Sequence, residues 1–315
     1  MKQLRRLRPG DLVEVRAPLE ILQTLDENGA LDGWPFMPEM IEFIGKRFRV
    51  RRRVLKTCIS IGNSTNMRAV KAADVVILEG LRCSGVDHDG CQKSCAIFWR
   101  EAWLRRVDAA APLPGADPDG IERLRARLKT TSGPETYFCQ ASELMKVTGP
   151  MRRPERFTMC FTDVRVGNCS ALEMAGRIGV WLYWRIRRIL LGVYAPGTNQ
   201  KTPTETLNLR SGELVEVKSL RGITETLDAR AHNRGLYFTP DMAELCGRDE
   251  RVERRLEKII VDGTGQMRQM RNTVYLEGAH CGCSHVAFGG CPRNEYSYWR
   301  EIWLHRKPER IDSHS

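Results

Sequence analysis

The stretch GDLVEV at positions 10–15 decides the fold, because it returns at positions 212–217 as GELVEV. The two copies also share a later motif, WREAWL at 99–104 and WREIWL at 299–304. A sequence that repeats itself at long range predicts one structural module used twice. The two copies can be aligned with each other, so each position has an internal counterpart.

Within each copy the pattern is mostly that of β-strands. Apolar and polar residues alternate over 12–16 and 214–218, as expected for strands with one buried face. Apolar runs at 75–78 and 273–276 predict strands buried on both faces. Gly-containing segments at 62–64 and 263–265 predict hairpin turns. Short strands joined by such turns favour a small barrel.

The GDLVEV opening, followed by a strand, a hairpin and a second strand, resembles SH3-like barrels. The whole chain resembles an uncharacterised bacterial family with two such repeats, Cys/His metal loops and a helical middle segment. That family is associated with polysaccharide or secondary-metabolite loci. The resemblance implies an accessory role in such a pathway and supplies no catalytic residues. The predicted fold class is α+β, mainly β, with two SH3-like repeats flanking a small helical domain.

Composition shifts along the chain predict five segments. They are an SH3-like zinc repeat at 7–107, a linker and short helix at 108–134, a helical middle domain at 135–195, a linker at 196–206 and a second SH3-like zinc repeat at 207–307.

The composition indicates a globular and basic protein. The formal net charge is +11, which indicates either an anionic partner or a solvated arginine-rich surface. The N-terminal residues lack the apolar segment of a secretory signal. Eleven cysteines in such a chain favour a reducing compartment and thiolates used for metal rather than disulfides. We therefore expect a cytoplasmic protein.

The first repeat carries four candidate metal ligands in one loop: Cys83, His88, Cys91 and Cys95. Tetrahedral zinc takes sulfur and nitrogen ligands of these kinds, at about 2.0–2.3 Å from the ion. Such a loop can wrap around one ion without help from other segments. The alternative is buried thiols beside a surface histidine. The pattern predicts a structural zinc site, and an iron–sulfur cluster is the less favoured alternative because clusters usually take four thiolates.

The second repeat offers Cys281, His285 and Cys291 at matching places, but a glutamate replaces the last cysteine. Cys246 gains a thiol where the first repeat has an isoleucine, so we expect it to be the fourth ligand. Cys283 is the competing candidate. Each repeat would then hold one Cys₃His zinc ion.

The chain shows no established catalytic motif. A Gly-rich phosphate loop, a nucleophile elbow and a two-His metal motif are all missing. A closed four-ligand zinc site leaves no position for water, whereas a three-ligand site would open one. We expect a binding or scaffold protein, and no catalytic residue is assigned. The alternative is an accessory metalloenzyme of a polysaccharide or secondary-metabolite pathway.

An anionic partner, either nucleic acid or a phosphorylated biosynthetic intermediate, fits the charge. A candidate anion-binding strand contains Lys46, Arg47, Arg49, Arg51 and Arg53. A protein partner is a further option. The apolar segment 171–192 is interrupted by arginines, so it predicts either a helix packed between the repeats, which we favour, or a helix lying on an anionic membrane. Cys139, Cys160 and Cys169 lie in the middle segment and suggest no defined site.

Overall fold

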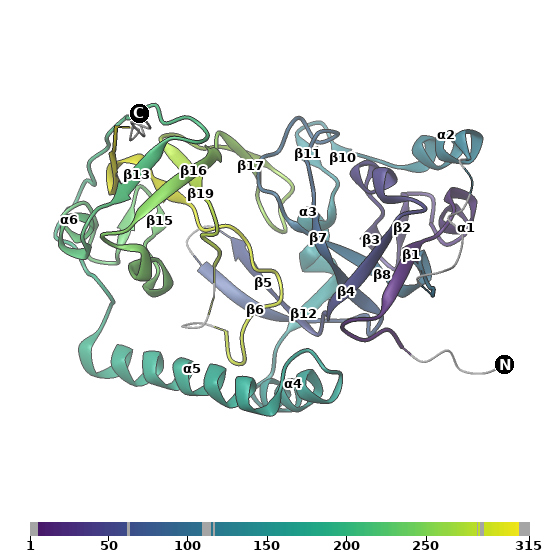
Figure 1. Ribbon diagram of the computed structural model, residues 1–315, viewed down its shortest axis with the longest axis horizontal. Coiled ribbons are helices and arrows are strands. Elements are labelled where there is room, and N and C mark those ends of the chain that lie inside the picture. Colours follow the sequence, from purple (N-terminus) through teal and green to yellow (C-terminus); the bar gives the residue numbers. More distant parts are fainter. Residues whose placement is uncertain are drawn as a thin grey trace, which may run out of the picture.

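The computed structural model describes residues 6–61, 64–108, 115, 117–281, 283 and 287–308. It is a mixed α/β structure in which strands predominate, which confirms the mainly β class (Figure 1). Two five-stranded sheets lie at opposite ends of its long axis, and the chain's long helices run along one side (Figure 1).

The two sheets have the same antiparallel strand order. The first is β8 (Ala96–Arg100), β7 (Val75–Arg82), β4 (Arg47–Arg53), β1 (Leu12–Val15) and β9 (Leu104–Arg106). The second is β20 (Trp299–Arg300), β19 (Thr273–Leu276), β16 (Asp249–Arg255), β13 (Leu214–Val217) and β21 (Leu304–Arg306). Their registers match, since Val13 pairs with Arg106 and Val215 with Arg306.

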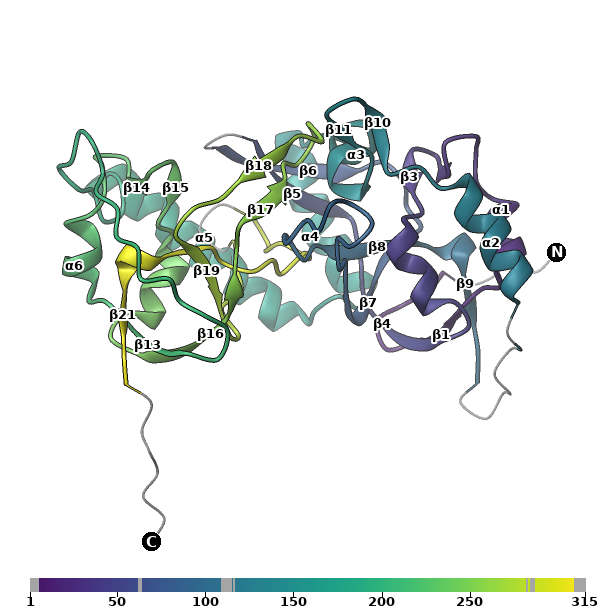
Figure 2. The same cartoon turned by 90° about the horizontal axis from the view of Figure 1, so that it is seen from above.

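A hairpin leaves each sheet and reaches toward the other copy (Figures 1 and 2). The first hairpin and its extra strand are β5 (Lys56–Ile61), β6 (Ser64–Val70) and β12 (Thr148–Pro150). The second hairpin is β17 (Lys258–Ile260) and β18 (Met267–Gln269). Both fall where turns were predicted. Lys56 Nζ donates to the carbonyl oxygen of Phe288 at 2.7 Å, and the Gln92 amide donates to that of Lys258 at 2.9 Å.

Shorter elements complete the fold. The helices are α1 (Pro18–Leu22), α2 (Pro118–Arg127), α3 (Gln140–Val147), α4 (Arg153–Arg165), α5 (Ala171–Leu191) and α6 (Leu220–Thr224). The 3₁₀ turns are η1 (Pro38–Phe43), η2 (Glu101–Trp103), η3 (Pro240–Leu245) and η4 (Glu301–Trp303). The two-residue and three-residue strands are β2 (Ala30–Leu31), β3 (Trp34–Pro35), β10 (Thr131–Gly133), β11 (Thr136–Tyr137), β14 (His232–Asn233) and β15 (Leu236–Tyr237).

The paired tryptophans form the centre of each core. Trp99 and Trp103 are fully buried, and Phe36 packs edge-on against both rings. Trp299 and Trp303 are equally buried in the second copy. Because no face of these rings reaches solvent, they stabilise the repeats and are not available to stack on a base or sugar.

The middle segment divides between the first core and an exposed arm. Leu124, Leu144 and Val147 of α2 and α3 belong to the core of the first repeat. In contrast, α5 lies along the outer edge of the molecule, and Met174 is its one buried residue (Figure 1). The favoured interpretation of α5 as a helix packed between the repeats is therefore wrong. None of the described helices is long and apolar enough to cross a membrane.

Candidate metal centres

Four cysteines from both repeats converge where the two copies meet. We call Cys58, Cys281, Cys283 and Cys291 the interface thiols. The Sγ atoms of Cys58, Cys283 and Cys291 all lie within 4.8 Å of one another. The Sγ atom of Cys291 is 3.3 Å from that of Cys58, and the Sγ atoms of Cys281 and Cys283 are 2.7 Å apart.

The first hairpin brings Cys58 to this cluster. Cys58 lies on β5, and its carbonyl oxygen accepts a 2.9 Å hydrogen bond from Arg293 Nη1, two residues beyond Cys291. Lys56 anchors the same strand to the loop carbonyl of Phe288. The contact between the repeats therefore holds the Cys58 thiol in place. The other interface thiols all belong to the second repeat and lie far from Cys58 in sequence.

The arrangement of the interface thiols suits a single ion. Sulfurs that surround zinc tetrahedrally at about 2.3 Å lie roughly 3.8 Å apart, which is close to the spacing of Cys58, Cys283 and Cys291, and Cys281 is the nearest further thiol. Side-chain hydrogen bonding with Cys283 and Cys58 lowers the pKa of Cys291 well below its usual range, while that of Cys58 is raised to about 12. Four thiolates at this place would close the tetrahedral coordination shell of one ion.

A second group of thiols lines a small cavity in the first repeat. We call Cys83, Cys91, Cys95 and Cys139 the cavity thiols, and they surround a volume of about 30 Å³. All four residues are described, yet no three of their sulfurs lie within 4.8 Å of one another. Burial raises the pKa of Cys83 and Cys95 well above the usual range and that of Cys139 to about 11.

Gly85 gives the first cysteine loop its tight turn. Its φ is +71°, and its carbonyl oxygen accepts hydrogen bonds from the amides of His88 and Cys91. A Cβ atom at this position would lie 2.0 Å from the carbonyl oxygen of Cys91. Any other residue would therefore open the loop.

The structure does not present His88 as a ligand. Its ring is buried, with Nδ1 2.6 Å from Glu39 Oε1 and Nε2 3.0 Å from the carbonyl oxygen of Phe138. The carbonyl oxygen of Phe138 can only accept, so Nε2 donates, and Nδ1 is placed to donate to an ionised Glu39 when the ring is an imidazolium. Burial opposes this charge, but the hydrogen bond and charge of Glu39 outweigh burial and raise the pKa of His88.

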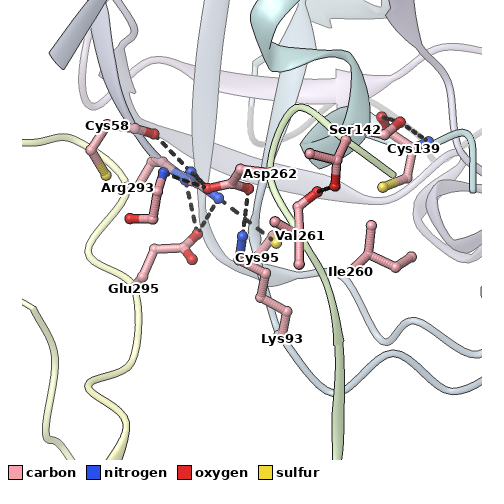
Figure 3. Close-up of polar contacts among 12 residues, drawn as sticks. Cys58, Lys93, Cys95, Cys139, Ser142, Ile260, Val261, Asp262, Arg293 and Glu295 are labelled. Atoms are coloured by element: carbon pink, nitrogen blue, oxygen red, sulfur yellow. Dashed lines mark hydrogen bonds and ion pairs between the residues drawn. The ribbon is translucent and has the colours of Figure 1, made fainter. Parts of the chain in front are cut away.

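A buried ion network lies between the two groups of thiols (Figure 3). Asp262 pairs with Lys93, and its second oxygen accepts from Arg293 Nη1 at 3.1 Å. Glu295, the counterpart of Cys95, binds Arg293 at 2.8 Å. Burial alone would raise the pKa of Asp262, but the charges of Arg293 and Lys93 lower it to about 2. The carboxylate of Asp262 is therefore stabilised in its charged form, whereas burial raises the pKa of Glu295.

Arg293 connects the two groups of thiols. Its Nη1 donates to the carbonyl oxygen of Cys58, and its Nη2 lies 3.8 Å from Cys95 Sγ (Figure 3). The side chain is 1 % exposed. One guanidinium thus fixes a residue of each group, which makes the spacing between the groups a property of the fold.

The structure places the remaining predicted cysteines elsewhere. Cys246 ends η3 and packs against the core of the second repeat, away from the interface thiols. Cys283, the competing candidate, is the one that joins them. Cys160 is buried beside Met174, and Cys169 packs at the edge of the same cluster. The predicted ligand His285 lies outside the described residues.

The candidate anion-binding strand is largely engaged within its own repeat. Arg47 pairs with buried Glu14 at 3.2 Å. Arg53 is buried and binds Glu101 and the carbonyl oxygen of Leu7. Of the others, Arg49 donates to the carbonyl oxygen of Gly10, Arg51 is partly buried and Lys46 is exposed. These side chains do not form one open basic face.

Sequence reasoning missed Cys58 and Cys139 as partners of the cysteine loops. Both lie far from the loops in sequence. The first hairpin carries Cys58 to the loop of the second repeat, and the start of α3 carries Cys139 to the loop of the first repeat. One signal was present for Cys58. Its counterpart in the second copy is Ile260, which is the same exchange of thiol and isoleucine that drew attention to Cys246.

Comparison of the chain with family models, curated proteins and solved structures finds no match. The assignment of a role therefore depends on the geometry of the thiol groups and of the exposed surface.

Proposed function

We propose that this chain is a binding protein whose two SH3-like repeats are clamped by one zinc ion at the interface thiols. In this proposal the anionic partner is a lipid surface, on which α5 docks. The observation that carries the docking role is the apolar face that α5 exposes. The clamp makes the two repeats one rigid body that carries this helix.

The clamp is supported by the origin of its ligands. Cys58 comes from the first repeat, while Cys283 and Cys291 come from the second, and their sulfurs already lie within 4.8 Å of one another. Zinc is favoured because it binds soft thiolate ligands well. Its filled d shell imposes no geometry of its own, so the ion accepts a tetrahedral set of thiolates. With Cys281 as fourth ligand, the shell is closed, which fits a structural ion better than a catalytic one.

One side of α5 carries several exposed apolar side chains. Leu172, Tyr183, Ile186 and Leu190 follow one side of the helix and are 83, 60, 47 and 74 % exposed. Phe161 of α4 adds a side chain that is 78 % exposed. Exposed apolar side chains along one side of a helix mark a surface that binds a protein or a membrane.

The arginines of α5 are held back from this face. Arg185 lies over the ring of Trp181 at 5.6 Å, and Arg187 lies over Trp184 at the same distance. Trp181 in turn packs on Phe288 of the second repeat. A helix that lies in a lipid interface has one apolar face, which enters the acyl region, and cations on its other sides. The arginines of such a helix reach the phosphates of the lipid headgroups.

A second copy of the chain is the alternative occupant. Two chains that meet through this helix would bring together two proteins that each carry a net charge of +11. An anionic lipid surface instead complements that charge, so the lipid is the occupant that we propose.

Vesicle sedimentation tests the docking role. The full chain should sediment with vesicles of phosphatidylcholine and phosphatidylglycerol, and less so with phosphatidylcholine alone. The double variant Ile186→Ser with Leu190→Ser should remain in solution. Leu220→Ser is the matched control, because Leu220 is an exposed leucine on α6. Equal sedimentation of the α5 variant, or a dimer that this variant abolishes in the absence of lipid, would overturn the proposal.

A further inference from the structure

The cavity thiols come from three segments, two in the first repeat and one in the middle segment. Cys83 directly follows β7, Cys91 and Cys95 lie in the loop before β8, and Cys139 caps α3. The rest of the wall combines apolar side chains, among them Met37, Phe98 and Ile260, with the polar residues His88, Lys93, Ser94, Gln140 and Arg293. Four thiols thus line one small cavity.

The spacing of these thiols differs from that of the interface thiols in the same chain. Three of the interface thiols, Cys58, Cys283 and Cys291, lie within 4.8 Å of one another, whereas no three of the cavity thiols do so around their cavity of about 30 Å³. In a multi-iron cluster the sulfurs bind different iron atoms, so they are more widely spaced than around one ion. The cavity therefore suits a cluster better than a single zinc ion.

Each sulfur of the cavity thiols has a nearby N–H donor. The Ile260 amide donates to Cys91 Sγ at 3.3 Å, and Arg293 Nη2 lies 3.8 Å from Cys95 Sγ. Backbone hydrogen bonds from Gly85 reach Cys83, and those from Ala141 and Ser142 reach Cys139. Hydrogen bonds to sulfur stabilise thiolates, and they tune the potential of iron–sulfur clusters.

We propose that the cavity thiols bind an iron–sulfur cluster. Such clusters are held by four thiolates, and the cavity offers four thiols. His88 does not compete as a ligand because both of its ring nitrogens form hydrogen bonds. The second repeat lacks this site, since Glu295 replaces Cys95 and binds Arg293. The chain would then hold two centres of different chemistry, with Arg293 between them.

Elemental analysis of the full chain tests this proposal. The protein is produced in iron-replete cells and purified without oxygen. We expect iron and acid-labile sulfide in equal amounts, visible absorption from sulfide-to-iron charge transfer and an iron–iron shell in X-ray absorption. Two zinc ions per chain without sulfide, or a chain without iron, would overturn the proposal.

Two matched variants locate the cluster. Cys139→Ala should lose iron and sulfide but keep the zinc of the interface thiols, and that zinc shows that the repeats are still folded together. Cys160→Ala, at a buried cysteine outside both groups, should keep both metals. Unchanged iron in Cys139→Ala would place the cluster elsewhere and contradict the assignment. If Cys139→Ala does not fold, the iron and sulfide content of the unmodified chain decides.

Discussion

Cys58 and Ile260 occupy equivalent positions in the two hairpins, and each lies against the cysteine loop of the other copy. Cys58 Sγ is 3.3 Å from Cys291 Sγ, and the Ile260 amide is 3.3 Å from Cys91 Sγ. The two copies thus exchange hairpins, but only one hairpin contributes a thiol. The first loop takes its fourth thiol from Cys139 instead. This asymmetry explains why the two groups of thiols differ in spacing and, in our account, in metal.

Replacing Cys58 should release the interface ion. Cys58→Ser removes one of four ligands, so zinc affinity should fall by more than the roughly 10–100-fold that loss of an outer-shell partner costs. Competition with a coloured chelator measures this change. Cys246→Ser is the control, because Cys246 packs in the core of the second repeat. Zinc loss from Cys246→Ser with retention in Cys58→Ser would contradict the assignment.

Asp262 should be essential to the contact between the repeats. Asp262→Asn leaves the buried cations Lys93 and Arg293 without their shared carboxylate, and breaking such a buried pair costs about 3–5 kcal/mol. The free energy of unfolding from urea titration measures the loss. Asp249→Asn removes an exposed pair with Lys307, so it should cost no more than about 1 kcal/mol. Equal costs for the two variants would show that the network contributes little.

The pair of His88 and Glu39 should make stability depend on pH. The pKa of His88 is raised on folding, so its contribution is complete below the unfolded value of 6.5. That contribution is lost as the pH rises through the folded-state pKa. The difference in unfolding free energy between the unmodified chain and His88→Asn should be about 1.5–3 kcal/mol at low pH and should shrink as the pH rises. His305→Asn, on the exposed strand β21, serves as control. A difference that grows with pH would contradict the imidazolium assignment.

The arginines of α5 should contribute to lipid binding without stabilising the fold. Each arginine near an anionic surface is worth about 1 kcal/mol, so Arg185→Gln with Arg188→Gln should weaken vesicle binding roughly 30-fold. The midpoint of thermal unfolding should stay unchanged because Arg188 is exposed and Arg185 rests on one ring. Arg221→Gln, on exposed α6, should bind as the unmodified chain does. Binding that does not respond to salt would count against this account.

The sequence predicts local features better than the meeting of distant segments. The strands at 12–15 and 214–217 and the two hairpins follow from alternation and turn residues. The ligand sets do not follow from the sequence, because the alignment of the copies assumes that each repeat supplies all the ligands of its own metal site. Hairpin exchange brings Cys58 across the interface, and Glu39 of η1 engages His88. Neither contact leaves a periodic pattern in the sequence.

The most direct test of the central claim is zinc X-ray absorption of the full chain. Our account predicts one zinc ion at the interface thiols with a first shell of about four sulfurs at about 2.3 Å. Cys58→Ser should change that shell, whereas Cys246→Ser should leave it unchanged. A shell containing nitrogen in place of a sulfur, or a purified chain that binds no metal at this site, would contradict the claim.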